Sequence, residues 1–202
     1  MAITIDMEHT ALLAMDFEND LVHEDGAFKD FGFAKMVKDN DVFGKTARLL
    51  DAARRSGVKV IYVSVKWRPG HPSINRSAGL FQAVVEANAL VEGTWGATIH
   101  EAVAPREGEP AVTKRAASAF AGSDLANLLS ASGITTLLLT GVATNFVVEG
   151  TAREAVDRGY NVFVVGDCCA SLSQEAHDSA LTTALPFLTT ITTSAEAIAA
   201  LS

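Results

Sequence analysis

Two charged residues follow apolar segments of the chain in a way that suggests acid–base chemistry. The apolar run 10–15 ends in Asp16, and the short run 110–113 ends in Lys114. A carboxylate at the end of a buried strand is costly to desolvate unless it is paired or used. Because burial raises the pKa of a carboxyl group and a neighbouring ammonium lowers it, the pair can poise Asp16 as a proton shuttle. The alternative is a buried salt bridge that only orders the sheet.

The turn 141–145, Gly-Val-Ala-Thr-Asn, follows the apolar run 134–139 and leads into a helical pattern. Where a buried strand turns sharply into a helix, backbone N–H groups and the positive end of the helix dipole converge. Such a turn can stabilise an anion or a developing oxyanion. The alternative is structural, in which Thr144 caps the helix and Gly141 permits the tight turn.

Strands and helices alternate along the chain, and this pattern predicts how these residues are positioned. Apolar or β-branched runs predict strands at 10–15, 58–65, 110–113, 134–140, 160–165 and 187–191. Periodicity and stop signals predict helices at 41–56, 123–132, 144–158, 174–184 and 194–201. We expect 26–40 to be loop, and 66–109 to be a functional loop region with a helix at 81–91.

This alternation predicts one domain, 1–202, with a parallel sheet that helices cover on both faces. In such sheets ligands bind beyond the carboxyl ends of the strands. Asp16, Lys114 and Gly141 each follow the carboxyl end of a predicted strand, so we expect them to lie close together.

The composition argues against several classes of function. The net charge is −8 and no basic stripe is present, so nucleic acid is not an expected partner. No run of about 18 apolar residues occurs, so no membrane span is expected. The first eight residues carry no basic region followed by an apolar block, from which we expect a cytoplasmic protein. The adjacent Cys168 and Cys169 are expected to be reduced, because a bridge between neighbours is strained.

Short motifs over nearly the whole chain resemble those of the isochorismatase-like hydrolases, the superfamily that includes nicotinamidases and N-carbamoylsarcosine amidohydrolase. The matching segments are 16–20 (Asp-Phe-Glu-Asn-Asp), 93–97 (Gly-Thr-Trp-Gly-Ala), 112–114 (Val-Thr-Lys), 118–125, 141–145 and 151–155. Each is weak alone, but they occur in the family's order and spacing. The resemblance implies an α/β fold: a Rossmann-like, three-layer α/β/α sandwich with a six-stranded parallel sheet in the order 3-2-1-4-5-6. It also implies a homodimer or homotetramer.

The chain departs from the Asp–Lys–Cys triad of the family's cysteine hydrolases at one position. By resemblance, Asp16 matches the Asp and Lys114 the Lys, but the expected Cys position holds Val147. Valine cannot act as a nucleophile, unlike a thiolate at a helix N-terminus. The alternative nucleophiles are Thr144, Thr151, Cys168 and Cys169. True isochorismatases lack the cysteine and cleave a vinyl ether, with the Asp as acid and water as the attacking group. This chain keeps the Asp and the Lys that such a mechanism would use.

The resemblance does not extend to the metal site of the nicotinamidases. Those enzymes hold a metal with Asp-x-His and a later His, whereas this chain has Lys66, Arg68 and His71 at the aligned positions. One histidine does not make a site, so neither a metal nor another cofactor is expected. His71 is then a substrate contact or a loop hydrogen-bonding residue. Surface positions are expected for His9, His23, His100 and His177.

Further residues in these motifs are candidates for binding the substrate. Besides His71, they are Phe17, Trp67, Trp95, Phe120, Val142, Ala143 and Thr144. The aromatic residues would line an apolar cleft, but they are equally good core residues. The resemblance implies a cis peptide between Val142 and Ala143. Positive charge at the mouth of the pocket, or only a solvated rim, would come from Lys66, Arg68 and Arg115.

The sequence therefore predicts an enzyme, a small-molecule hydrolase of the isochorismatase-like superfamily that lacks the catalytic cysteine. Asp16 would act as acid and base, Lys114 as its electrostatic partner, and the turn 142–145 as the oxyanion cradle. The substrate would be small and carboxylate-bearing, with an amide or vinyl-ether type bond. The alternative is a catalytically silent homologue that binds a ligand or serves as an oligomeric scaffold. A scaffold does not need a buried ion pair at a crevice, so the pair favours the enzyme.

Overall fold

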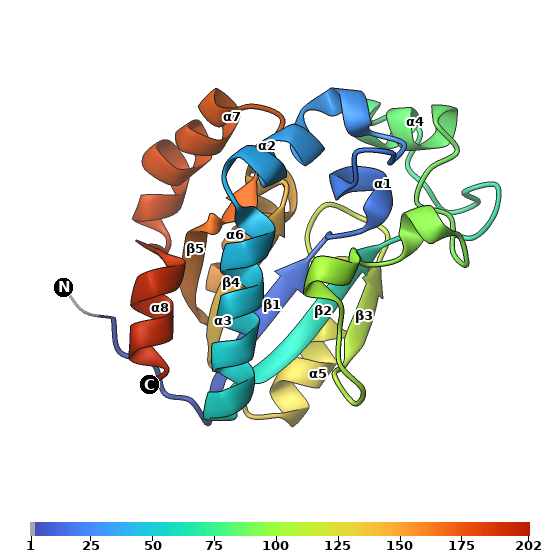
Figure 1. The fold of residues 1–202 in the computed structure, drawn as a ribbon. Helices are drawn as coiled ribbons and strands as arrows, with labels where there is room; N and C mark the ends of the chain where they lie inside the picture. Colours follow the sequence, from blue (N-terminus) through green and yellow to red (C-terminus); the bar gives the residue numbers. More distant parts are fainter. Residues whose placement is uncertain (1–2) are drawn as a thin grey trace.

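A single parallel sheet with helices on both faces forms the core of the protein (Figure 1). The computed structural model describes residues 3–202. Within them, six strands pair in the order β3-β2-β1-β4-β5-β6, and all pairs are parallel. The strands are β1 (Thr10–Met15), β2 (Lys59–Val65), β3 (Ala111–Lys114), β4 (Thr136–Val142), β5 (Asn161–Ala170) and β6 (Thr190–Thr192). The predicted fold class and strand order are confirmed.

Two apolar cores lie on opposite faces of the sheet, because successive side chains of a strand point to opposite faces. In the central strand β1, Leu12 and Ala14 pack into one core, whereas Leu13 and Met15 pack into the other. The first core is covered by α2 (Phe33–Asp39), α3 (Val42–Ser56) and α8 (Ser194–Ala200). The second is covered by α5 (Leu125–Ala131) and α6 (Glu149–Asp157). Figure 1 shows α3 and α8 side by side in front of the sheet.

Shorter elements form the remaining connections, several of them around the carboxyl ends of the strands (Figure 1). They are α1 (Asn19–Val22), η1 (Lys29–Phe31), α4 (Gly79–Glu86), η2 (Trp95–Ala97), η3 (Glu101–Val103), α7 (Gln174–Ser179), η5 (Ala180–Ala184) and η6 (Leu185–Phe187). The long segment predicted as irregular, 66–109, contains α4, η2 and η3, and its helix ends before the predicted 91. In residues 3–202, no helix is both long enough and apolar enough to cross a membrane.

The prediction of a loop over 26–40 is wrong, because this segment contains η1 and α2. Phe33, Met36 and Val37 lie at the i, i+3, i+4 spacing of a helix face, and all three are buried. The polar residues between them occupy the solvent side of α2. A short amphipathic helix was therefore hidden by the mixed polarity of the segment.

Most other elements lie within about two residues of their predicted bounds, and three differ more in extent or helix type. The helix expected at 144–158 begins with a π-helical turn, η4 (Thr144–Val148), before it continues as α6. Strand β5 extends to Ala170, beyond the predicted end at 165. The last strand is Thr190–Thr192 rather than 187–191, because Pro186 belongs to the 3-10 helix η6.

Candidate active site

Asp16 and Lys114 form a buried ion pair at the carboxyl ends of β1 and β3. The Nζ atom of Lys114 lies 2.8 Å from Oδ2 of Asp16, and both side chains are almost wholly inaccessible to solvent. Lys114 also donates to the carbonyls of Ala116 (2.8 Å) and Ala117 (3.0 Å). An ammonium has three hydrogens, so these three acceptors satisfy Lys114 completely.

The second carboxylate oxygen of Asp16, Oδ1, is buried and has no hydrogen-bond partner within the described chain. Burial raises the pKa of Asp16 to about 6, although the ammonium of Lys114 opposes this shift. A carboxyl group with a pKa near the working pH can both accept and donate a proton. Asp16 thus has a free oxygen and the proton affinity that acid–base catalysis requires.

Glu18 is a second buried carboxyl group near this pair, and the sequence reasoning did not single it out. Its Oε1 accepts a hydrogen bond from the backbone N–H of Val65 (2.7 Å), at the end of β2. Its Oε2 is buried without a partner in the described chain. Burial and then the negative charge of Asp16 raise the pKa of Glu18 to about 8, so Glu18 is mostly protonated at pH 7. The available signal was its position two residues after Asp16, in the segment that directly follows a buried strand.

The turn after β4 is held by hydrogen bonds from two other segments. The peptide bond between Val142 and Ala143 is cis, as the resemblance implies. The hydroxyl of Thr144 donates to the carbonyl of Ala170 (3.0 Å) and lies 2.7 Å from Nδ1 of His177. Because a hydroxyl has one hydrogen, Nδ1 of His177 is the donor in the second contact. The prediction of a surface position for His177 is wrong, since its contact with Thr144 buries it in the protein.

Val147, at the position of the expected nucleophile, is buried in the π-helical turn η4 and lines the same cavity as Asp16 and Lys114. The structure therefore brings the three predicted catalytic positions together. The alternative nucleophiles lie elsewhere. The Thr151 hydroxyl accepts a hydrogen bond from the backbone N–H of Ala119 (2.9 Å), and neither Thr144 nor Thr151 lines the cavity.

Both cysteines are free and buried, and neither lines the cavity. Cys168 packs in the core under α3, whereas Cys169 packs in the core on the opposite face of the sheet. Burial raises the pKa of the Cys168 thiol to about 12 and also raises the pKa of Cys169. Both thiols are therefore protonated at neutral pH, which makes them poor nucleophiles.

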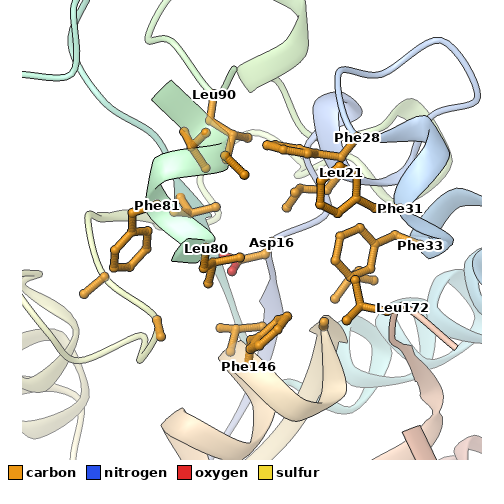
Figure 2. Close-up of a pocket in the computed structure, with 18 of the residues that line it drawn as sticks. Asp16, Leu21, Phe28, Phe31, Phe33, Leu80, Phe81, Leu90, Phe146 and Leu172 are labelled. Carbon is orange, nitrogen blue, oxygen red and sulfur yellow. The ribbon is translucent and has the colours of Figure 1, made fainter. Parts of the chain in front are cut away.

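The cavity above Asp16 has a volume of about 400 Å³ and an apolar wall (Figure 2). Such a volume is within the range of roughly 300–1,000 Å³ for small-molecule sites. Its aromatic lining residues are Phe28, Phe31, Phe33, Trp67, Phe81 and Phe146. Figure 2 shows the labelled rings around the opening, with the carboxylate of Asp16 between them. The cavity thus places the Asp16 carboxylate against a largely hydrophobic wall.

Comparison with known families gives one match that covers most of the chain. The model of the isochorismatase domain matches residues 10–196. The chain belongs to the isochorismatase family. Structural comparison agrees: a cysteine hydrolase of Pseudomonas syringae pv. phaseolicola superposes with a TM-score of 0.89 at 26% identity, covering 98% of this chain and 95% of that one.

Two relatives within the isochorismatase family have named activities. A ureidoacrylate amidohydrolase of Methylobacterium radiotolerans is 31% identical over 192 residues, which is 89% of this chain and 74% of the relative. A maleamate amidohydrolase of Pseudomonas putida is 33% identical over 141 residues, which is 68% of this chain and 63% of the relative. The chain is therefore an isochorismatase-family hydrolase with amidohydrolase homologues.

The structure separates the predicted substrate contacts of this isochorismatase-family protein into two groups. Trp67, Val142 and Ala143 line the cavity with Asp16. Outside its lining are Phe17, His71, Trp95, Phe120 and Thr144.

The residues of the second group have other surroundings. Phe17 is buried and its ring lies 6.3 Å from that of Phe43. His71 is buried, and its Nε2 lies 2.8 Å from the carbonyl oxygen of Ala89, which is the loop hydrogen bond that was its alternative role. Trp95 is half exposed. Phe120 lies under the guanidinium of Arg158, 4.9 Å from ring centroid to Cζ.

The cations expected at the mouth do not line the cavity either. Arg115 pairs with Glu92 at 2.5 Å, and the cavity lining includes neither Lys66 nor Arg68. Among residues 3–202, no three His, Cys, Asp or Glu side chains are grouped so that they could hold a metal ion.

Sequence reasoning missed most of the cavity wall. The larger of the missed residues are Leu21, Phe28, Phe31, Phe33, Leu80, Phe81, Leu90, Phe146 and Leu172. Three of the phenylalanines, Phe28, Phe31 and Phe33, lie inside the segment 26–40 that was expected to be loop, and they span only six consecutive positions. That density of aromatic residues next to a predicted strand end was the signal that could have indicated a binding wall.

Proposed function

We propose that this protein hydrolyses a small molecule without a covalent enzyme intermediate, using Asp16 as acid and base and water as the attacking group. The observation that carries the proposal is the position of Asp16. Its carboxylate faces the cavity beside Val147, has one free oxygen, and has a pKa of about 6. Lys114 holds the other oxygen and so fixes the orientation of the carboxylate.

For an amide, ionised Asp16 takes a proton from water as the water oxygen attacks the carbonyl carbon. The carbonyl π bond breaks and leaves a tetrahedral oxyanion, which the N–H groups of the turn 142–145 would stabilise. The C–N bond then breaks as Asp16 returns the proton to nitrogen, giving a carboxylic acid and an amine. Amidohydrolase relatives support this bond class.

For a vinyl ether, protonated Asp16 would instead give its proton to the terminal alkene carbon. Water adds to the resulting oxocarbenium carbon as the Asp16 carboxylate takes a proton from that water, which gives a hemiketal. Asp16 then gives this proton to the ether oxygen as the C–O bond to the leaving group breaks. The remaining hydroxyl proton returns to Asp16, and the products are a carbonyl compound and an alcohol. Neither reaction needs a nucleophile from the protein, so both are compatible with Val147 at this position. Both reactions use the same proton shuttle, and a substrate panel separates them.

The test compares wild type with Asp16→Asn on a panel of amides, carbamoyl compounds and enol ethers. We expect turnover to fall by roughly 100-fold or more in the variant, which is the usual contribution of a general acid or base. Asp124→Asn, at an exposed residue outside the cavity, is the matched control and should keep wild-type activity. Circular dichroism checks that both variants fold.

Turnover that survives Asp16→Asn would refute the role of Asp16. Turnover of no compound, with ligand binding retained, would favour the alternative of a catalytically silent ligand-binding protein. The homodimer or homotetramer, the cytoplasmic location and the single-domain boundary stay predictions.

A further inference from the structure

The charge distribution in the cavity indicates which substrates it can accept. Of the lining residues in the described chain, only Asp16 and Lys114 are charged, and they neutralise each other at 2.8 Å. All three hydrogens of the Lys114 ammonium already have acceptors. A substrate carboxylate could gain a hydrogen bond from Lys114 only if one of these bonds broke.

The nearby cations do not compensate for this lack of positive charge. Arg115 is paired with Glu92, and Lys66 and Arg68 are absent from the lining. In the proposed reaction the turn 142–145 receives the oxygen of the reacting group, so a separate substrate carboxylate would lose its hydration and meet mainly aromatic and aliphatic side chains. Burying an unpaired charge in apolar surroundings is strongly unfavourable.

The indole N–H of Trp67 does not supply a donor to the cavity either. Trp67 is wholly buried and lines the cavity, and its Nε1–H has no acceptor in the described chain. A buried indole N–H usually has a partner. Because this nitrogen has almost no accessible surface, it gives a substrate carboxylate no hydrogen bond that could offset the lost hydration.

The opening of the cavity is also apolar. Phe31, Leu80 and Leu172 come from three separate segments, and each is more than one third exposed although it lines the cavity. In Figure 2, Phe31 and Leu172 lie on one side of Asp16 and Leu80 on the other. The part of the ligand that lies at the mouth therefore contacts hydrocarbon rather than charge.

We infer that the cavity binds an uncharged substrate with an aromatic body and one neutral hydrolysable group, an amide or an enol ether, placed at Asp16. The reaction named in this inference rests on the proposed function, whereas the binding preference does not depend on it. It differs from the carboxylate-bearing substrate expected from the sequence. It also separates this chain from its named relatives, since ureidoacrylate and maleamate are carboxylates.

Binding can be measured without turnover by displacement of N-phenyl-1-naphthylamine, a neutral fluorescent probe of apolar cavities, from wild type and from Asp16→Asn. The competitors are 3-phenylpropanamide and succinamate, which share a propanamide chain and differ in a phenyl or a carboxylate group. We expect the phenyl compound to bind at least roughly tenfold more tightly, since the ring buries apolar surface and the carboxylate loses hydration.

Two variants at the mouth and one control sharpen this test. Phe31→Ala should weaken binding of the phenyl compound severalfold. Leu80→Arg adds a cation at the mouth, so it should reduce the difference in affinity between the phenyl compound and succinamate. Both residues are partly exposed, so the substitutions should leave folding intact. Phe187→Ala removes an equally large but 86% exposed ring outside the cavity and should change neither affinity.

Equal or tighter binding of succinamate would overturn the inference, and so would an effect of Phe187→Ala as large as that of Phe31→Ala. The two proposals fail in different ways. Selective binding of aromatic amides without turnover of any amide or enol ether would refute the reaction and leave the substrate class standing. Turnover of carboxylate-bearing amides with no activity on aromatic amides would refute the substrate class and leave the reaction standing.

Discussion

Replacing Glu18 by Gln should remove a strong pH dependence of stability. Gln has the same shape, and its carbonyl oxygen can still accept the hydrogen bond that Val65 N–H gives to Glu18. It does not titrate. The wild-type carboxyl group has a pKa of about 8 in the folded protein against an ordinary value of 4.5, because of burial and the charge of Asp16.

Between these two pKa values the folded protein keeps a proton on Glu18 that the unfolded chain has released. The free energy of unfolding therefore falls as pH rises, by about 1.4 kcal/mol per pH unit. Over the roughly 3.5 units that separate the two pKa values, the total is about 5 kcal/mol. The stabilisation is complete below pH 4.5 and is lost by about pH 8.

The assay is urea unfolding followed by circular dichroism from pH 5 to pH 9. Titrations of groups away from Glu18 occur in both proteins, so the difference between wild type and Glu18→Gln reports Glu18 together with its electrostatic effect on Asp16. We expect Glu18→Gln to gain stability relative to wild type steadily up to about pH 8 and to level off above it. Glu24→Gln, at a glutamate whose side chain is 77% exposed, is the control and should give a flat difference. A flat difference for Glu18→Gln would refute the reasoning.

Three further substitutions test other parts of the site. Lys114→Met leaves the Asp16 carboxylate buried without its partner. The free energy of unfolding, measured with urea, should therefore fall by about 3–5 kcal/mol. A fall of less than about 1 kcal/mol would show that the pair is not buried as described. Val147→Cys should make the native protein react with iodoacetamide, detected by mass spectrometry, whereas wild type stays unmodified; alkylation of native wild type would mean that its own thiols are accessible. Gly141→Ala should lower the free energy of unfolding by about 2–4 kcal/mol, because Gly141 has φ +145° and a Cβ would lie 2.3 Å from the carbonyl oxygen of Met15. An unchanged thermal unfolding temperature would refute this steric argument.

The sheet and the placement of the ion pair could be predicted from the sequence because both depend on local patterns. Each buried strand is a continuous apolar run, and the rule that carboxyl ends of parallel strands share an edge is enough to bring Asp16 to Lys114. The motif resemblance then supplied the strand order and the identity of position 147.

The cavity wall could not be predicted in the same way, because it is made by contacts between distant segments. Phe31 and Phe33 belong to a short helical region whose partner surface, the end of the sheet, exists only in the folded chain. Trp95 and Phe120 were equally plausible lining residues by type, but their loops turn them away from the cavity. His177 has no sequence feature that indicates its contact with Thr144, 33 positions away.

The extension of β5 to Ala170 has a consequence for chemical durability. It places the only two sulfhydryl groups of the chain inside the sheet, one on each face. Peroxide attacks exposed thiolates and converts them stepwise to sulfenic, sulfinic and sulfonic acids. A hydrolase that depends on a thiolate nucleophile is inactivated by that sequence of reactions. With Val147 in the cavity and both thiols protonated in the core, this protein presents no such target and should keep its function under oxidative stress.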